Sequence, residues 1–325
     1  MKTPKYWQSN SLISKLLTPL GKIYGAVTQW RLKTVKPQKA DVPVICIGNI
    51  TAGGTGKTPV SLSIAKLLTT ELFHPIFVTR GYGGKLQNVL VNNKKHSAHD
   101  VGDEPLLLSQ QAPVVVNADR YAGAQLAIRE GADVIIMDDG FQNPGLFKNL
   151  SFLVFDGHFG IGNGKIIPAG PLRETFADGI KRADALIILG KDIHNLAERT
   201  DLPVFFGHTE AAQTVVNRDN VLAFAGIGHP QKFYHTLSQQ GLNIVKTIDF
   251  PDHHYYTKDE IEKILEQAKQ LHAEVYTTGK DFVKIPTLYH KSINVLDISV
   301  VWDKPEELLQ FIKQKISVSQ AKIKN

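Results

Sequence analysis

A glycine-rich segment near residue 50 has the residue types and spacing of a phosphate-binding loop. It lies between an apolar run and a helical pattern, and it reads Thr51-Ala52-Gly53-Gly54-Thr55-Gly56-Lys57-Thr58. Glycines let successive backbone N–H groups turn toward phosphate oxygens, and the following helix adds the positive end of its dipole. Lys57 is expected to reach the outer phosphates and Thr58 to ligate Mg²⁺. One residue departs from the general pattern, because Thr51 occupies the position of its first glycine.

A pair of carboxylates follows a second buried run. Val134–Met137 is apolar and leads directly into Asp138 and Asp139. Open α/β sheets bind ligands at the carboxyl ends of their strands, so we expect one of these aspartates to hold Mg²⁺ together with Thr58. Adjacent strand residues point to opposite faces, so the two aspartates share one role only if the strand has already ended. The sequence leaves open which of them binds the metal.

Other polar clusters predict chemistry less specifically. Asp103 and Glu104 precede an apolar helix. Asp252-His253-His254 precedes another helix and is expected to provide a general base or the partner of one. The histidines lack further ligands at a zinc spacing, so we do not predict a zinc site. Basic or glycine-rich ends of predicted strands are expected to form a cationic rim, comprising residues 79–85, 119–120, 170–174 and 277–281.

The elements that must position these residues alternate between strand and helix. Strands are predicted over 42–47, 75–78, 114–116, 134–137, 152–155, 185–189 and 204–206, with helices over 59–71 and 120–130 among them. This alternation predicts a parallel sheet with helices on both faces. A second series begins near residue 220, with strands over 221–225, 244–247, 274–277 and 294–298 and helices over 231–240, 258–272 and 305–316. We therefore predict a core domain over 41–218 and a smaller C-terminal α/β domain over 219–325.

The first 40 residues form a separate basic segment. They hold eight lysines and arginines and no acidic residue, so the total net charge of +6 leaves residues 41–325 at −2. Apolar residues from Leu12 to Trp30 recur at helical spacing, which predicts an amphipathic helix. Such a helix either lies on an anionic membrane surface or packs on its own domain with a solvated basic face. The sequence alone does not decide between these two.

Composition limits the classes of protein to which this chain can belong. Length and the shares of hydrophobic (42%) and charged (21%) residues are those of a globular chain of one large or two modest domains. A single cysteine, Cys46, excludes an intramolecular disulfide and is compatible with a reducing compartment. Because the positive charge is confined to one segment, we do not expect a nucleic-acid partner. The sequence makes no prediction of an oligomeric state.

Six ordered motifs carry a resemblance to one family. They are Asn49-x-Thr51-x-Gly53-Gly54-Thr55-Gly56-Lys57-Thr58-Pro59, Arg80-Gly81-Tyr82, Gly102-Asp103-Glu104-Pro105, Asp138-Asp139-Gly140-Phe141-Gln142, Gly170-Pro171-Leu172-Arg173-Glu174 and Asp252-His253-His254. From the N-terminal helix to about residue 284 the chain resembles the tetraacyldisaccharide 4'-kinases, the lipid A 4'-kinases of Gram-negative bacteria. The threonine at position 51 is normal for that family.

The resemblance implies a P-loop NTPase-like fold and an activity. The expected reaction is transfer of the γ-phosphate of ATP, with Mg²⁺, to the 4'-hydroxyl of a tetraacylated glucosamine disaccharide 1-phosphate. The expected location is peripheral, at the cytoplasmic face of the bacterial inner membrane. A lipid with four acyl chains stays in the bilayer, so its kinase has to reach the interface, and this favours an anionic membrane surface as the partner of the N-terminal helix.

The resemblance also implies roles for single residues. Asp103 or Glu104 is the expected base for the sugar hydroxyl, with His253 as the partner that orients it or tunes its pKa, and Arg173 is expected to stabilise phosphate charge. ATP is assigned to Thr51, Ala52, Gly53, Gly54, Thr55, Gly56, Lys57 and Thr58. The lipid substrate is assigned to Arg80, Tyr82, Glu104, Arg120 and Gln142.

Other nucleotide-binding classes fit less well. Partition-type ATPases carry a lysine before the paired glycines, where this chain has Ala52. GTP-binding switches need an Asn-Lys-x-Asp guanine reader, but Asn93-Lys94 is followed by two basic side chains. If the chain were a peripheral membrane protein without enzymatic activity, the aspartate pair would have no function. A P-loop kinase for another small molecule remains the principal alternative, because the loop does not specify an acceptor.

Overall fold

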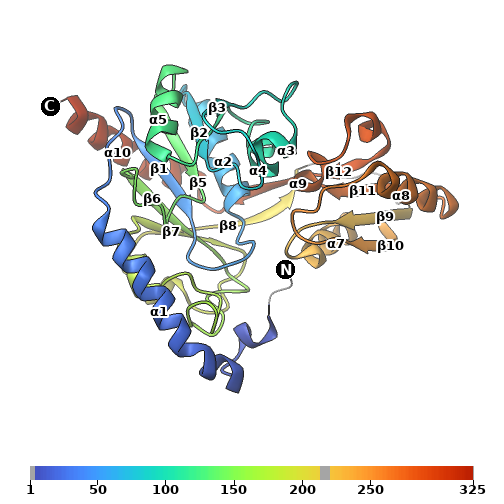
Figure 1. Cartoon of the computed structure of the whole chain (residues 1–325), viewed down its shortest axis with the longest axis horizontal. Helices are drawn as coiled ribbons and strands as arrows, with labels where there is room; N and C mark the ends of the chain where they lie inside the picture. Colours follow the sequence, from blue (N-terminus) through green and yellow to red (C-terminus); the bar gives the residue numbers. More distant parts are fainter. Residues whose placement is uncertain (1–3, 213–219, 325) are drawn as a thin grey trace.

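The computed structural model describes residues 4–212 and 220–324, with side chains to residue 318 (Figure 1). Within these ranges nine strands form one sheet in the order β13-β8-β7-β6-β1-β5-β2-β4-β3. Neighbouring strands from β8 to β4 are parallel, and the outermost two, β13 and β3, are antiparallel to their neighbours. The strands are β1 (Val44–Gly48), β2 (Pro75–Thr79), β3 (Val89–Leu90), β4 (Val114–Val116), β5 (Val134–Asp138), β6 (Leu150–Asp156), β7 (Ala185–Leu189), β8 (Val204–Ala211) and β13 (Ile298–Trp302).

Both faces of this sheet are buried, as expected for a parallel sheet whose strands are apolar throughout. Alternate residues of β1 enter opposite cores: Ile45 and Ile47 join one cluster, and Val44 and Cys46 join the other. The first core includes side chains of α2 (Lys57–Thr70), α3 (Ala98–Val101), α4 (Asp103–Leu108) and α10 (Pro305–Lys324); the second includes those of α5 (Arg120–Arg129) and α6 (Phe176–Ile180). The predicted sheet with helices on both faces is confirmed.

A second, smaller sheet lies beside the first (Figure 1). Its described strands are parallel in the order β10 (Asn243–Asp249), β9 (Asn220–Ala225), β11 (Glu274–Thr278) and β12 (Asn294–Leu296). Helix α7 (Pro230–Gln239) packs on one face, and α8 (Lys258–Gln270) and the short 3-10 helix η3 (Thr287–Ser292) pack on the other. The short helix α9 (Gly279–Phe282) follows β11, and a further 3-10 turn, η2 (Ala197–Arg199), lies between β7 and β8.

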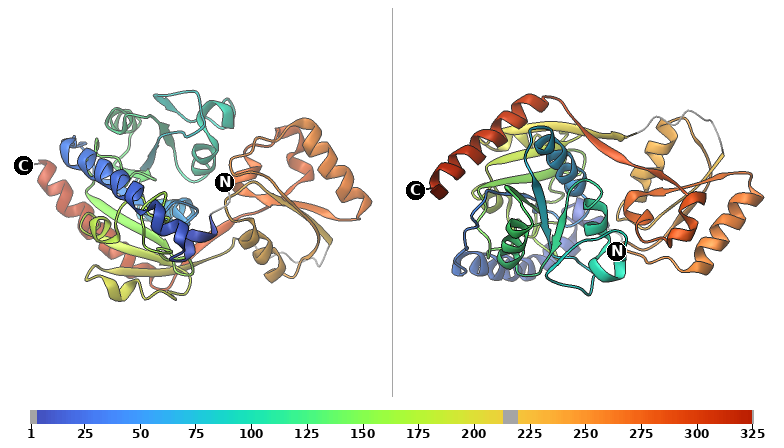
Figure 2. Two further views of the ribbon diagram at one scale, coloured as in Figure 1. Left: turned by 60° about the horizontal axis from the view of Figure 1, so that its bottom comes forward. Right: turned by 90° about the horizontal axis from the view of Figure 1, so that it is seen from above.

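The predicted end of the second domain needs correction. The predicted strand over 294–298 coincides with β12, which ends at Leu296, and includes only the first residue of a further strand, β13, which begins at Ile298. Strand β13 returns to the first sheet and pairs antiparallel with β8. The right-hand view of Figure 2 shows α10 over the first sheet, where its apolar side chains are buried. We therefore propose that the second domain comprises residues 220–296; the predicted boundary at 218/219 lies outside the described residues.

Helix α1 (Leu12–Thr34) follows a 3-10 turn, η1 (Lys5–Gln8), and lies along the outside of the first domain (Figure 2). It packs through small residues: Ser14, Gly21 and Gly25 are buried, and the Ser14 hydroxyl donates to the carbonyl of Ala169 at 2.8 Å. A Cβ at Gly21 would lie 2.6 Å from the Ile166 carbonyl oxygen, so the contact requires glycine. Larger apolar side chains of α1 remain exposed, namely Leu12, Ile13, Leu16, Leu20, Ile23, Tyr24, Val27 and Trp30.

Among the described helices, none combines the length and hydropathy needed to cross a bilayer.

Candidate active site

The phosphate-binding loop leaves the buried strand β1 and is braced from within. The Asn49 side-chain amide donates to the Thr51 carbonyl at 2.7 Å and to the Thr55 hydroxyl at 3.0 Å. Gly53 and Gly56 have positive φ angles of 120° and 85°, a region that favours glycine. The loop ends at Lys57, where α2 begins, so its free N–H groups lie at the positive end of a 14-residue helix.

The segment 171–173 forms backbone hydrogen bonds with this loop and brings Arg173 into the site. The Ala52 N–H donates to the Pro171 carbonyl at 2.7 Å, and the Arg173 N–H donates to the Ile50 carbonyl at 2.7 Å. Two short stretches far apart in sequence therefore form one backbone unit. These bonds hold the backbone of Arg173 beside the phosphate loop.

Asp138 is the last residue of β5 and is 2% exposed. Its carboxylate accepts hydrogen bonds from Thr58 at 3.2 Å and from Ser61 at 2.7 Å. Burial raises the pKa of Asp138 to about 7, and the negative charge of Glu104 contributes to the increase, while the Ser61 bond and Lys57 oppose it. Ser61 was not predicted from the sequence, since a serine one turn into an apolar helix has no distinctive signature.

Asp139 has different partners because the strand has ended. Its φ angle of 52° turns the backbone, so the two adjacent carboxylates do not simply alternate across the sheet. Lys57 Nζ lies 3.7 Å and Arg173 Nη1 3.3 Å from Asp139 Oδ1. Burial alone would raise the pKa of Asp139, but these two cations together hold it below its usual range. The structure therefore gives Asp138 the hydroxyl partners and Asp139 the cationic ones.

Gln142, a predicted substrate contact, is hydrogen-bonded at both ends of its amide. Its Nε2 donates to the Asn49 carbonyl at 2.8 Å and to Glu174 at 3.0 Å, and its Oε1 accepts from Arg173 at 3.2 Å. Glu174 is fully buried and also pairs with Arg182. We interpret Gln142 and Glu174 as residues that position Arg173 beside the phosphate loop.

A second cluster joins the two domains. The carboxylate of Asp103, at the start of α4, lies 2.9 Å from Nδ1 of His253, which follows β10 in the second domain. Asp103 is 3% exposed, and its other oxygen accepts from the Glu104 N–H at 2.9 Å. Burial opposes the ionised form of Asp103, but its bond to His253 and the charge of Lys280 hold the pKa of Asp103 below its ordinary value of 3.8. The same bond raises the pKa of His253.

The two clusters lie within electrostatic range of each other. Glu104, next to Asp103, is among the charges that raise the pKa of Asp138. Gly102, which directly precedes Asp103, has a φ of 95° and lies at the turn into α4. The phosphate loop, the aspartate pair and the Asp103–His253 pair therefore belong to one site at the carboxyl edge of the first sheet.

The predicted rim residues divide between exposed and buried positions. The Tyr82 ring is 65% exposed, and its centroid lies 5.5 Å from that of His253. Arg120 is 6% exposed, and its Nη1 donates to the Asn117 carbonyl at 2.6 Å. Burial lowers the pKa of Arg120 to about 10, and the positive charge of Arg80 acts in the same direction, whereas Asp139 opposes it. Arg80 and Arg120 thus place positive charge near the aspartate pair.

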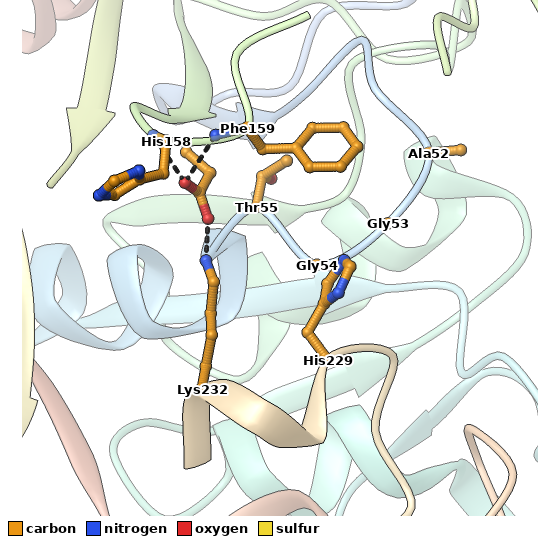
Figure 3. A pocket seen from close by; sticks show the side chains of 9 residues that line it. Ala52, Gly53, Gly54, Thr55, His158, Phe159, His229 and Lys232 are labelled. Atoms are coloured by element: carbon orange, nitrogen blue, oxygen red, sulfur yellow. Dashed lines mark hydrogen bonds and ion pairs between the residues drawn. The ribbon is translucent and has the colours of Figure 1, made fainter. Parts of the chain in front are cut away.

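A cavity of about 140 Å³ lies between the phosphate loop and the second domain (Figure 3). It is lined by Ala52, Gly53, Gly54, Thr55, Asp156, His158, Phe159, His229 and Lys232. Asp156 ends β6, accepts from the backbone N–H groups of His158 and Phe159, and pairs with Lys232 of α7. The rings of Phe159 and His229 face the cavity with centroids 6.1 Å apart. No role was predicted for Asp156, His158, Phe159, His229 or Lys232, because they lie at or after the ends of β6 and β9, in different sheets, and no local pattern connects them.

The residues at the aspartate pair suit a hard cation that also binds phosphate. Mg²⁺ usually takes one or two carboxylates together with a hydroxyl, waters and phosphate oxygens. Thr58 and Asp138 supply such oxygens 3.2 Å apart. In residues 4–212 and 220–324, no three histidine, cysteine or acidic side chains cluster as a metal site made by protein alone. This donor set fits Mg²⁺ shared with a nucleotide.

Comparison with known proteins gives matches over nearly the whole chain. A family model described as tetraacyldisaccharide-1-P 4'-kinase matches residues 13–317. The tetraacyldisaccharide 4'-kinase of Rhodospirillum centenum is 44% identical over 98% of this chain and 97% of its own. That of Parvibaculum lavamentivorans is 47% identical over 88% and 87%.

A solved structure is similar over the same extent. It is LpxK from Aquifex aeolicus in complex with ATP, with a TM-score of 0.78 and 27% sequence identity. The match covers 94% of this chain and 100% of that one.

Proposed function

The chain belongs to the tetraacyldisaccharide 4'-kinase family, and from this membership and the geometry of its site we propose how its residues carry out that reaction. The protein is an ATP-dependent kinase of lipid A biosynthesis, and its acceptor is the 4'-hydroxyl of a tetraacylated disaccharide 1-phosphate. The observation that best supports the residue roles is the convergence of Lys57, Asp138 and Arg173 with the Asp103–His253 pair at one sheet edge.

The phosphate loop and two cations bind the triphosphate. The N–H groups at the start of α2 face the phosphates, and Lys57 and Arg173 are held within 4 Å of Asp139, where the transferred group passes. Thr58 and Asp138 hold Mg²⁺, with Asp139 beside them. When bound, this ion neutralises charge on the phosphate oxygens. Gln142 and Glu174 keep Arg173 in place, so we assign them to positioning.

Asp103 is the base for the acceptor. The 4'-oxygen forms a bond to the γ-phosphorus, the bond from that phosphorus to the β–γ bridging oxygen breaks, ADP leaves, and the hydroxyl proton passes to the Asp103 carboxylate. Asp103 is ionised at neutral pH because its pKa is held low, and the bond from His253 fixes its orientation. A positioned base contributes about 10²–10⁴-fold, so we expect the phosphate cluster to supply more of the rate. Tyr82, Arg80, Glu104 and Arg120 border the acceptor side.

The adenosine of ATP lies in the cavity beside the loop. The γ-phosphate is directed toward β5, whose end carries the aspartate pair, so the nucleoside extends toward the opposite neighbour of β1, which is β6. The cavity lies there, at the end of β6 and beside the phosphate loop. Phe159 and neutral His229 offer ring faces to the base, since burial and Lys232 lower the pKa of His229.

Helix α1 places the enzyme on an anionic membrane surface. Its exposed apolar side chains form a strip, and Lys15, Lys22, Arg31 and Lys33 on the same helix are exposed. Its buried face contacts the segment around Ile166 and Ala169, which continues to Arg173 in the active site. An interfacial helix of this kind brings the site close to lipid headgroups. We assign the enzyme to the cytoplasmic face of the bacterial inner membrane as a peripheral protein, without a nucleic-acid partner.

The test is transfer of labelled γ-phosphate from ATP to a tetraacylated glucosamine disaccharide 1-phosphate in detergent micelles, with Lys57→Ala as the control. We expect lipid phosphorylation that Lys57→Ala reduces by at least about 10²-fold, because a lost transition-state cation costs that much or more. Hydrolysis of ATP without lipid phosphorylation would contradict the acceptor. Undiminished transfer by Lys57→Ala would contradict the assignment of the loop.

A further inference from the structure

The segment Thr278–Lys284 carries two lysines that the reaction described above does not use. Lys280 Nζ lies 3.3 Å from Nε2 of His253, 3.5 Å from Asp252 and 3.8 Å from Glu104. Lys284 Nζ lies 4.0 Å from Asp103. Both domains thus contribute groups to one cluster of charges around the Asp103–His253 pair.

This segment is anchored by a carboxylate with no exposure to solvent. Asp281 accepts hydrogen bonds from the Gly226 N–H at 3.0 Å, the Thr278 hydroxyl at 2.8 Å, the Tyr256 hydroxyl at 2.9 Å and Lys284 at 2.8 Å. A buried carboxylate with its acceptor sites filled holds the backbone rigidly. The side chain of the neighbouring Lys280 therefore extends from a rigid backbone, and its ammonium is not a mobile surface charge.

The contacts of His253 define which of its nitrogens carries the proton. A lysine ammonium can only donate hydrogen bonds, so Nε2 of His253 has to be unprotonated to accept one from Lys280. Nδ1, 2.9 Å from the Asp103 carboxylate, then carries the hydrogen and donates it. These contacts match the neutral Nδ1–H tautomer, while the bond to Asp103 raises the pKa of His253 and so opposes the neutral form. An imidazolium would direct a second N–H at the ammonium.

We propose that Lys280 is a positioning residue for this kinase: it holds His253 as the neutral Nδ1–H tautomer, so that Asp103 faces an imidazole and not an imidazolium. This inference rests on the proposed role of Asp103 as the base. A carboxylate paired with a full positive charge binds a proton less well than one that accepts a neutral N–H bond. Lys280 itself lowers the pKa of Asp103 through space, but an imidazolium would place its charge 2.9 Å from the carboxylate. By opposing that imidazolium, Lys280 preserves the basicity of Asp103 at neutral pH.

The other charges around His253 are compatible with this role. Asp103 and Asp252 favour the imidazolium, with Asp252 3.9 Å from Nε2, and Lys280 opposes it. Lys284 Nζ lies 4.0 Å from Asp103, and Glu104 forms an ion pair with Lys280. The Tyr82 ring lies beside the imidazole. Lys280 itself stays charged: burial disfavours its ammonium, but Asp103, Glu104 and Asp252 together raise its pKa. Lys280 is the cation in contact with the histidine, so its removal is expected to favour the imidazolium.

The experiment compares Lys280→Met with Lys280→Arg, and with Lys263→Met as a matched loss of an exposed lysine from α8. The pH dependence of lipid phosphorylation is measured at saturating ATP and lipid. Removing a like charge in contact shifts a pKa by about one unit, so we expect the acid limb of Lys280→Met to move to higher pH by about that amount. The rate near pH 7 then falls up to about tenfold and recovers at higher pH. Lys280→Arg and Lys263→Met keep the wild-type profile.

Two further measurements separate this inference from a purely structural role. In a His253→Gln background, Lys280→Met should no longer move the limb near neutral pH, because that effect passes through the histidine; only the direct effect of Lys280 on the low pKa of Asp103 remains. Nitrogen-15 NMR of His253 should show an unprotonated Nε2 in the wild type and an earlier protonation in Lys280→Met. An unchanged acid limb, or an unchanged His253 titration, overturns the inference. Full activity of Asp103→Asn would instead refute the base itself.

Discussion

The exposed strip of α1 gives a quantitative prediction for membrane binding. Leu16, Leu20 and Ile23 are 71%, 55% and 62% exposed, and none of them holds the helix to its domain. The triple change of these residues to glutamine should leave the fold intact, because glutamine is a good helix former and the packing face is untouched. Thermal unfolding should therefore stay within a few degrees of the wild type.

The magnitude follows from the apolar area that the strip can still bury. Full burial of a leucine or isoleucine side chain contributes about 1.5–3 kcal/mol, so three side chains with about 60% of their area exposed contribute about 3 kcal/mol at the lower end. The vesicle affinity of the variant should then fall about 100-fold, at about 1.4 kcal/mol per factor of ten. The lysines of the segment keep a residual binding that falls with salt.

The assay is sedimentation with vesicles that contain phosphatidylglycerol, followed by phosphorylation of the acceptor presented in the same vesicles. ATP affinity serves as an internal control and should not change. Leu288→Gln is the matched variant, because Leu288 is 70% exposed but lies on the second domain. If the triple variant binds vesicles within about threefold of the wild type, the strip is not the membrane-binding surface.

Two further predictions concern the nucleotide and the acid range. Phe159→Ala should weaken ATP binding about tenfold through lost ring contact, as measured with a fluorescent ATP analogue, whereas a matched change at Phe147, which is 38% exposed and outside the cavity, should not. The pKa of Asp103 is lowered in the folded protein, so its contribution to stability is complete above the unfolded value near 3.8 and is lost as the pH falls through the folded value. Asp103→Asn should therefore flatten the loss of thermal stability below about pH 4, and an equal slope in both proteins would contradict the pairing with His253.

The sequence predicted the positions of the chemical groups best where they lie in one contiguous segment. The phosphate loop and the aspartate pair are local patterns, because a loop that wraps phosphate needs its glycines and lysine in a fixed order. The structure brings them together as expected, with Thr58 3.2 Å from Asp138. Ser61 and Glu174 complete the same site. Ser61 occupies an ordinary helix position that no local pattern distinguishes, whereas Glu174 belongs to the 170–174 motif but was given no role of its own.

Long-range pairing accounts for the part of the fold that was missed. Strand β13 was not predicted beyond its first residue, because its partner is β8 and pairing with a distant strand is not encoded in a local pattern. The face that α1 buries was not predicted either. The apolar stripe of a helix usually faces the core. In α1 the buried face instead consists of Ser14, Gly21 and Gly25, because only small residues allow the helix to approach the Ile166 backbone.

The lysine of the 277–281 segment shows why charge in a sequence differs from charge in a site. As one of several basic strand ends, Lys280 was expected to belong to a cationic rim. In the structure its ammonium contacts His253 and lies within 4 Å of Glu104 and Asp252, so its charge is largely compensated. A cation surrounded by carboxylates attracts a phosphate weakly but strongly influences the protonation of a neighbour. Lys280 therefore differs from Arg173 of the same predicted rim, because Arg173 pairs with Asp139 whereas Lys280 lies among the charges around the Asp103–His253 pair.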